Sequence, residues 1–164
     1  MGARIQCLGL LPLFLLGFTP DPAGNRPRGL DSILGIRVGS SFEEARARFD
    51  PRAVRQLRGL EEDEKSEREG GRTKAWTLKD SEYGSVALKM NEAEKVVWIT
   101  GFLRPGREIP FSALGDLATA ARVTDSLVVW NVATPSGNYR LVGKGEKGRA
   151  RVVSLLSLAS ARPE

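Results

Sequence analysis

Apolar and polar residues alternate with a period of two over much of the chain after residue 73. This period is typical of strands that bury one face. The segment 95–103 is apolar on both faces, which indicates a central strand, and further strands are predicted at 127–132, 139–143 and 149–156. The apolar positions of two earlier strands are Trp76, Leu78, Val86, Leu88 and Met90.

A helical period precedes these strands. Ser40 and Ser41 are each followed three residues later by a glutamate, which gives two overlapping capping boxes and predicts a helix start. The residues that share the apolar side of this helix are Phe42, Ala45 and Phe49.

The Asp50–Pro51 pair ends this helix and favours the start of a second one, with Asp50 as its N-cap and Pro51 in its first turn. The two helices would form a short helical hairpin, and another short helix is expected over 111–121. The apolar stripe expected on the second helix of the hairpin is Val54, Leu57 and Leu60.

These elements predict an α+β domain in which the helical hairpin packs on an antiparallel meander sheet. The domain is expected to span 33–160, after a flexible leader at 24–32 that is rich in turn-forming residues. The segment 107–157 repeats the outline of 33–103, so two tandem α-β-β-β units are a further expectation.

The first 23 residues have the pattern of an export signal. A basic start at Arg4 is followed by fourteen largely apolar residues, 5–18, and then by a stretch rich in proline and glycine. Fourteen helical residues span about 21 Å, which is short of the ~30 Å hydrocarbon core of a bilayer. We therefore expect a signal peptide over 1–23 and a periplasmic or secreted protein, with an uncleaved membrane tether as the alternative.

The composition argues against catalysis. The chain has no histidine, and its single cysteine is Cys7, inside the apolar run 5–18. The commonest general base and the commonest metal ligands are therefore missing, and we expect no enzyme activity, no cofactor and no metal site. The formal net charge is +5, but lysine and arginine are interspersed with acids, so nucleic acid is not an expected partner. The charged run 61–69 is interpreted as a solvated loop.

One motif resembles a nucleotide-binding loop. Residues 143–148 (Gly-Lys-Gly-Glu-Lys-Gly) match G-x-G-x-x-G. A dinucleotide fingerprint must open a helix and be followed about twenty residues later by an acidic residue. Here the pattern continues as a strand at 149–156 and the sequence given ends at Glu164, so a hairpin turn is the interpretation.

Aromatic residues are the candidates for partner contact. An antiparallel sheet with helices on one side leaves its other face free, and aromatic side chains there contribute strongly to binding. Core packing is the competing interpretation for each of them. The candidate residues are Trp76, Trp98 and Trp130, with Tyr83 and Tyr139 at hairpin positions.

The stretch 33–45, followed by a helix that ends at Phe49-Asp50-Pro51 and by a three-stranded meander, resembles the BamE (SmpA/OmlA) and β-lactamase-inhibitor-protein-like superfamily of small exported domains. The residues that carry the resemblance are Ile36, Gly39, Ser40 or Ser41, Glu44 and Ala45. The resemblance covers about residues 33–103, and a second unit over the rest of the chain would match the tandem arrangement of the inhibitor proteins. The resemblance implies an exported binding module. The absence of a lipid-attachment motif departs from the lipoprotein members.

We therefore expect an exported binding or scaffolding protein of the bacterial cell envelope that presents a sheet face to an envelope or secreted protein. Two alternatives remain open at this point: a small-ligand or lipid carrier, and an inhibitor of a secreted enzyme. An enzyme that uses only carboxylates ranks below them. Peripheral membrane contact and the oligomeric state are left open.

Overall fold

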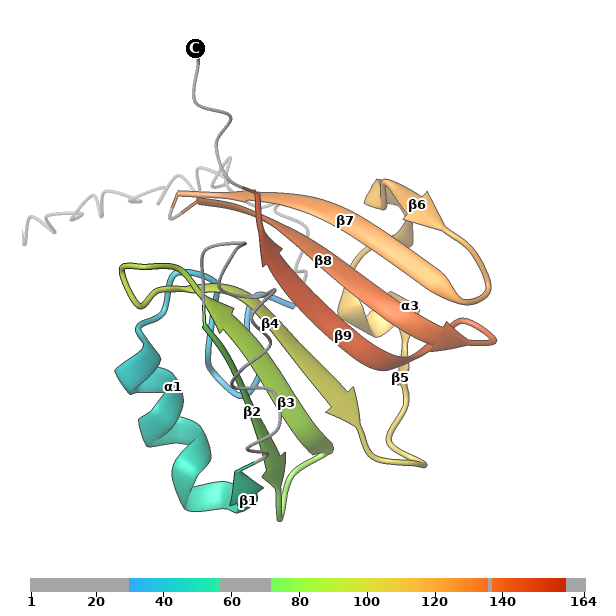
Figure 1. The fold of residues 1–164 in the computed structure, drawn as a ribbon. Helices are drawn as coiled ribbons and strands as arrows, with labels where there is room; N and C mark the ends of the chain where they lie inside the picture. Colours follow the sequence, from blue (N-terminus) through green and yellow to red (C-terminus); the bar gives the residue numbers. More distant parts are fainter. Residues whose placement is uncertain (1–29, 57–71, 136, 159–164) are drawn as a thin grey trace, which may run out of the picture.

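A computed structural model describes residues 30–56, 72–135 and 137–158 (Figure 1). The predicted signal at 1–23, most of the leader and the charged run 61–69 lie outside these ranges. The elements in chain order are α1 (Phe42–Phe49), η1 (Asp50–Arg52), β1 (Ala53–Gln56), β2 (Thr73–Leu78), β3 (Tyr83–Met90), β4 (Val96–Leu103), β5 (Ile109–Pro110), α3 (Phe111–Leu114), η3 (Leu117–Thr119), β6 (Arg122–Val123), β7 (Leu127–Thr134), β8 (Gly137–Glu146) and β9 (Arg149–Ser157).

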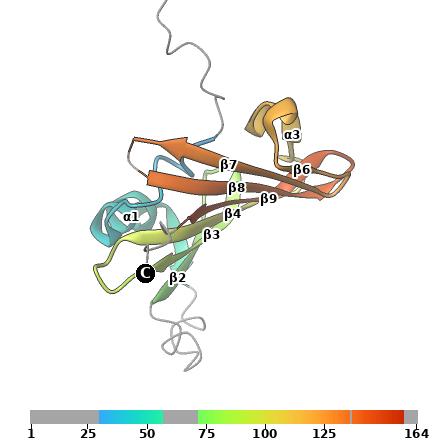
Figure 2. The same ribbon diagram turned by 90° about the horizontal axis from the view of Figure 1, so that it is seen from above.

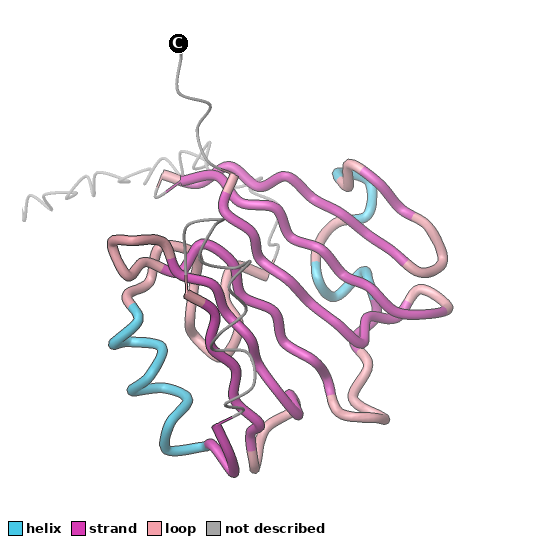
Figure 3. Tube along the Cα trace, in the orientation of Figure 1, coloured by secondary structure: helices cyan, strands magenta, loops and turns pink. Residues whose placement is uncertain are grey.

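The strands of the described residues, magenta in Figure 3, form one antiparallel sheet. Their order is β1-β2-β3-β4-β9-β8-β7-β6, and β5 pairs with β9 beside this path (Figure 1). The six strands expected from the sequence are β2, β3, β4, β7, β8 and β9, and all are present. The short strands β1, β5 and β6 are additional. Few helical residues and a large sheet give the α+β class that the sequence predicts.

Helix α1 begins where the capping boxes predict. The Ser41 hydroxyl accepts a hydrogen bond from the Glu44 backbone N–H, and the Glu44 carboxylate accepts one from the Ser41 backbone N–H. These two bonds satisfy backbone donors that a helix start leaves without intrahelical partners. Ala45 and Phe49 are buried, and the Phe49 ring lies 5.2 Å from the ring of Trp76 on β2. The helix is thereby fixed on one face of the sheet.

The prediction of a second helix that starts at Asp50 is wrong. Asp50–Arg52 forms a single 3₁₀ turn, and the chain then continues as the edge strand β1. The Asp50 carboxylate does not cap a helix, because it accepts a hydrogen bond of 2.8 Å from the indole N–H of Trp76. Val54 is 66% exposed and so builds no apolar stripe, while Leu57 and Leu60 lie outside the described residues.

The helix expected over 111–121 is also shorter than predicted. It ends at Leu114, and a separate 3₁₀ turn and the strand β6 follow. The indole N–H of Trp130 donates a 2.7 Å hydrogen bond to the backbone oxygen of Asp116. Its ring packs so closely on Gly115 that an added Cβ would lie 3.1 Å from the ring. The tryptophan therefore occupies the space next to the point where the helix would continue.

The core lies on one face of the sheet, which we call the buried face. Helix α1 contacts it at Trp76, the segment before α1 contacts it through Ile33, and α3 contacts it beside β7 and β8 (Figure 2). Two glycines allow this close approach. A Cβ added at Gly101 would lie 2.4 Å from the Tyr83 ring, and one at Gly143 would lie 2.6 Å from Leu114. Both helices and the segment 30–41 therefore pack on the same side of the sheet.

Candidate binding face

The other side of the sheet carries no described helix, and we call it the open face. Strand side chains alternate between the two faces, so the pairing register determines which residues belong to each. On six neighbouring strands the open-face residues form three rows that run across the sheet. The first row is Thr73, Lys89, Trp98, Leu156, Arg140 and Asn131. The middle row is Ala75, Ala87, Thr100, Ser154, Val142 and Val129. The third row is Thr77, Ser85, Phe102, Val152, Lys144 and Leu127.

The middle row contains only small side chains, none longer than valine. At its centre the hydroxyls of Thr100 and Ser154 form a hydrogen bond of 2.6 Å across β4 and β9. Thr100 is 3% exposed, yet no buried side-chain polar atom of the described residues lacks a hydrogen-bond partner. The middle row is therefore a low strip in which the polar groups already have partners and offer no unmet donor or acceptor.

The two outer rows carry the large apolar side chains. Trp98 and Leu156 are directly opposite each other in the first row, and Phe102 and Val152 are opposite each other in the third. Phe102 is 42% exposed, and the other three are partly exposed. Exposed aromatic and aliphatic side chains held on a rigid sheet are typical of protein contact surfaces.

The charge within the three rows has one sign, and Glu146, which follows on the same side of β8, is paired with Arg151. The three rows contain Lys89, Arg140 and Lys144 and no aspartate or glutamate. Arg140 also donates a 3.0 Å hydrogen bond from Nε to the Asn131 side-chain oxygen on β7, which holds the guanidinium over the sheet. The face combines an apolar centre with basic groups on β3 and β8.

Of the five predicted contact residues, the structure places only Trp98 on the open face. Trp76 and Trp130 are 1% and 3% exposed, and each indole N–H has a partner inside the fold. Tyr83 and Tyr139 are also buried, and the Tyr139 hydroxyl donates to the backbone oxygen of Leu30 at 3.3 Å. These four aromatic residues belong to the core.

The surroundings of the two tyrosines shift their titration. Burial, with a smaller contribution from the nearby Glu82 carboxylate, raises the pKa of Tyr83 to about 12. Burial and the Asp31 carboxylate raise the pKa of Tyr139 as well. Both hydroxyls therefore stay protonated to a higher pH than an exposed tyrosine would, as expected for core residues.

The sequence analysis chose its candidate contact residues among tryptophan and tyrosine, and it therefore missed open-face residues that lie mainly on β4, β8 and β9. Phe102, Val152 and Leu156 are on strands expected at 95–103 and 149–156, and the first of these was expected to be apolar on both faces. That second apolar face was the signal for Phe102, whereas Val152 and Leu156 are assigned to the open face only by their pairing with β4. Arg140 and Lys144 could be found only from the register of β8, because a basic residue on a strand does not by itself reveal which neighbours it has.

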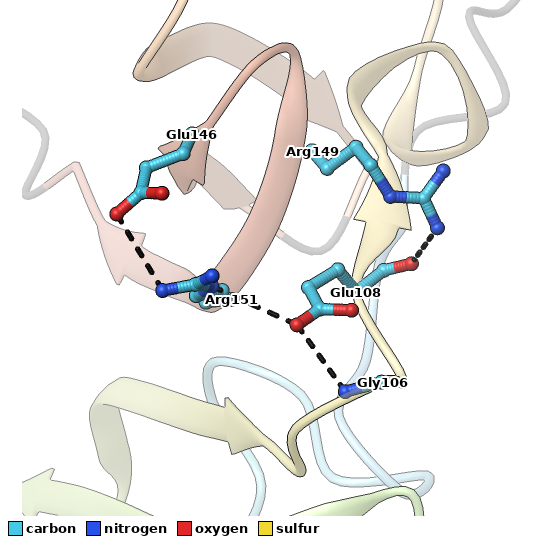
Figure 4. A network of polar contacts seen from close by, with 5 residues as sticks. All are labelled: Gly106, Glu108, Glu146, Arg149 and Arg151. Carbon is cyan, nitrogen blue, oxygen red and sulfur yellow. Dashed lines mark hydrogen bonds and ion pairs between the residues drawn. The ribbon is translucent and has the colours of Figure 1, made fainter.

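A polar network secures the end of the sheet beside the third row (Figure 4). Arg151 lies between two carboxylates, 3.6 Å from that of Glu108 and 3.5 Å from that of Glu146, and Arg149 donates to the backbone oxygen of Glu108 at 2.6 Å. Backbone N–H groups, Gly106 among them, and then the arginines hold the pKa of Glu108 below its ordinary value. The network links the loop that precedes β5 to the β8–β9 hairpin and is structural in character.

Two hollows occur at opposite ends of the sheet. One, of about 480 Å³, lies where β4 begins and β9 ends, and Val97, Tyr139 and Leu158 line it together with polar groups. The other, of about 840 Å³, is more open and has a largely charged lining that includes Arg52, Lys79, Arg104 and Arg107. Within 30–56, 72–135 and 137–158 no group of three or more acidic or cysteine residues is placed to hold a metal ion. In the same ranges no helix has the length and apolar character needed to cross a membrane.

Comparison of the chain with protein-family models, with curated proteins and with solved structures finds no match.

Proposed function

We propose that this chain is an exported, non-enzymatic binding or scaffolding protein of the bacterial cell envelope, and that it presents its open face to a protein partner. The observation that carries the proposal is the set of large apolar side chains on a sheet face that no described element covers. Trp98, Leu156, Phe102 and Val152 form its centre. Burying them against a partner would remove apolar surface from water at about 25 cal/mol per Å².

The face is suited to a protein partner because it is rigid. Its six strands are hydrogen-bonded to their neighbours, so little backbone conformational entropy is lost when a partner binds. Tryptophan and arginine are the side chains most often found at the energetic centre of protein interfaces. The open face offers Trp98 next to Leu156, with Arg140 as the following residue of the same row.

Export rests on the sequence of the first 23 residues, whose basic start, short apolar run and proline-rich end are typical of a signal peptide. A partner in the envelope or outside the cell follows from it. The test is fractionation of cells that make the full chain, with the N-terminus of the protein determined by mass spectrometry. Recovery of the intact chain in the cytoplasmic fraction would contradict export.

We also propose that the fold consists of two tandem α-β-β-β units. The order of the sheet supports this, because β2-β3-β4 and β9-β8-β7 are arranged symmetrically about the central β4–β9 pair. A short helix precedes each set of three strands, at Phe42 and at Phe111. The membership in the BamE-like and inhibitor-protein-like superfamily that the sequence suggests stays a proposal of the same kind.

The binding proposal is tested by affinity capture with the full chain from envelope extract. Phe102→Asp places a charge in the centre of the open face, and Val123→Asp places the same charge at a valine that is 50% exposed on the buried-face side of β6. Circular dichroism checks that both variants fold. We expect Phe102→Asp to reduce the recovery of a specific protein at least about tenfold, which corresponds to 1.4 kcal/mol, and Val123→Asp to leave it unchanged. Equal recovery by both variants would refute the proposal.

A further inference from the structure

We infer that the element of the partner that seats on the open face is an acidic, amphipathic α-helix lying across the strands, along the middle row. This inference rests on the proposed function and specifies the partner surface. It follows from three properties of the open face. The backbone of the sheet is already paired, the two outer rows are separated by about the diameter of a helix, and the three described rows contain cations and no aspartate or glutamate.

The backbone argument excludes an extended segment on this face. The N–H and C=O groups of the strands lie in the plane of the sheet, where they pair with neighbouring strands, so the face itself presents side chains. A peptide strand binds by adding to the edge of a sheet, where main-chain groups are available. A segment that covers the apolar centre must therefore satisfy its own backbone groups, and a helix does so internally.

The width of the low strip fits one helix. Trp98 and Phe102 are four residues apart on β4, as are Arg140 and Lys144 on β8, so the outer rows lie about 13 Å apart at ~3.3 Å per residue. A helix with its side chains is about 10–12 Å in diameter. The small side chains of the middle row, Thr100 and Ser154 among them, leave room for it, and the large side chains of the outer rows would contact its two sides.

The number of strands sets the length of the helix. The rows cross six strands, whose five gaps of about 4.8 Å give a strip about 24 Å long. At 1.5 Å per residue this corresponds to about 16 residues, or four to five turns. A helix of that length is common in globular proteins.

The charge selects an acidic helix. Arg140 in the first row and Lys144 in the third row lie on the two sides of the low strip, at the same strand β8. A helix in the strip would have one flank near each of them, so a glutamate or aspartate on both flanks is complementary, and lysine there would be repelled. The seam of the helix that faces Thr100, Ser154 and Val142 is expected to be apolar or small.

The test is site-specific photo-cross-linking with the full chain in cells that make it. A photoreactive phenylalanine analogue replaces Val142 in the middle row, or Val123 on the buried-face side of β6 as the control. Mass spectrometry identifies the cross-linked segment. The expected result is an adduct at position 142, absent at position 123, to a protein segment of about 16 residues that is helical, amphipathic and acidic. A synthetic peptide of that segment should bind the full chain about tenfold more weakly after Lys144→Glu, and equally well after Val123→Asp.

The other outcomes separate the two proposals. An adduct to a loop, to a strand or to a segment without acidic flanks overturns the helix inference and leaves the proposed function in place. Unchanged binding of the peptide to the Lys144→Glu variant overturns the charge argument and with it the inference. An adduct to lipid, or no adduct above the level of position 123, overturns both the inference and the proposed function.

Discussion

Gly101 lies on the buried face in the middle of β4, and its missing side chain is a condition for the packing of the core. An added Cβ would lie 2.4 and 2.5 Å from Cε1 and Cδ1 of Tyr83 and 3.2 Å from Cγ2 of Ile33. Real Cβ atoms do not approach other atoms within 3.0 Å. The Tyr83 ring is 3% exposed and has little space to move away. Replacement of Gly101 by alanine therefore forces a shift of the ring, of β4 or of both.

The magnitude follows from two opposing contributions. Inserting a methyl group into a well-packed core costs about 1–3 kcal/mol. Replacing a glycine inside a strand by alanine returns about 0.5–1 kcal/mol, because the unfolded chain loses conformational freedom. The difference between the two ranges is about 0–2.5 kcal/mol, so Gly101→Ala should lower the free energy of unfolding by about 1 kcal/mol. Gly84 on β3 is a matched control, since its nearest neighbour to an added Cβ is an Arg104 side-chain carbon at 3.6 Å, an ordinary contact.

Equilibrium unfolding of the full chain in urea, followed by tryptophan fluorescence, measures both variants. We expect Gly84→Ala to be neutral or slightly stabilising and Gly101→Ala to shift the midpoint to lower urea. A Tyr83→Ala background should remove most of the penalty of Gly101→Ala, because the clashing ring is then absent. If Gly101→Ala is as stable as Gly84→Ala, or if its penalty survives without the ring, the close contact is not the reason for the glycine.

Three further predictions concern the cap of α1 and the titrating groups. Ser41→Ala removes the hydroxyl that accepts from the Glu44 N–H and should cost about 1 kcal/mol, measured as a lower thermal midpoint, whereas an unchanged midpoint would show that the capping box is not needed. Because the pKa of Tyr83 is raised from 10 to about 12, its contribution to stability is complete below pH 10 and is lost as the pH rises through 12. Urea unfolding across this range should show a smaller loss of stability with rising pH in Tyr83→Phe than in the unchanged protein, and an equal loss in both would contradict the raised pKa of Tyr83. Because the pKa of Glu108 is lowered, its carboxylate stabilises the fold above its ordinary pKa of 4.5 and ceases to do so as the pH falls through the lowered value. Glu108→Gln should therefore reduce the loss of stability that the protein shows as the pH falls below 4.5, and an unchanged dependence on pH would argue against the network in Figure 4.

The sequence predicts those elements whose causes are local. The start of α1 is encoded by Ser41 and Glu44, three residues apart, and both hydrogen bonds of the capping box form. The six long strands follow from apolar patterns within about eight residues, alternating in most of them and continuous in 95–103, and that signal does not depend on the rest of the fold. Local patterns of this kind are sufficient to predict the α+β class.

Elements that depend on distant partners could not be predicted in this way. Asp50 is a good helix N-cap in isolation, but its carboxylate is used by Trp76, 26 residues later in the chain. Trp130 similarly lies against Gly115, and its indole N–H donates to the backbone oxygen of Asp116, 14 residues before it. The helix expected over 111–121 would have continued at this point. In both cases a tryptophan buried its ring and found a partner for its N–H inside the fold. The same contacts remove both tryptophans from the set of candidate contact residues.

The position of Trp98 shows why the open face required the register as well as the pattern. Counted by period two, Trp98 falls on the same side as Val96, which is fully buried opposite Met90. The pairing shifts between these positions, because Met90 is opposite Val96 whereas the preceding residue Lys89 is opposite Trp98, so that Val97 is an extra residue on β4. Such a bulge turns the residues that follow it to the other face. It therefore places Trp98, and with it Thr100 and Phe102, on the open face, while Ile99 and Gly101 complete the core.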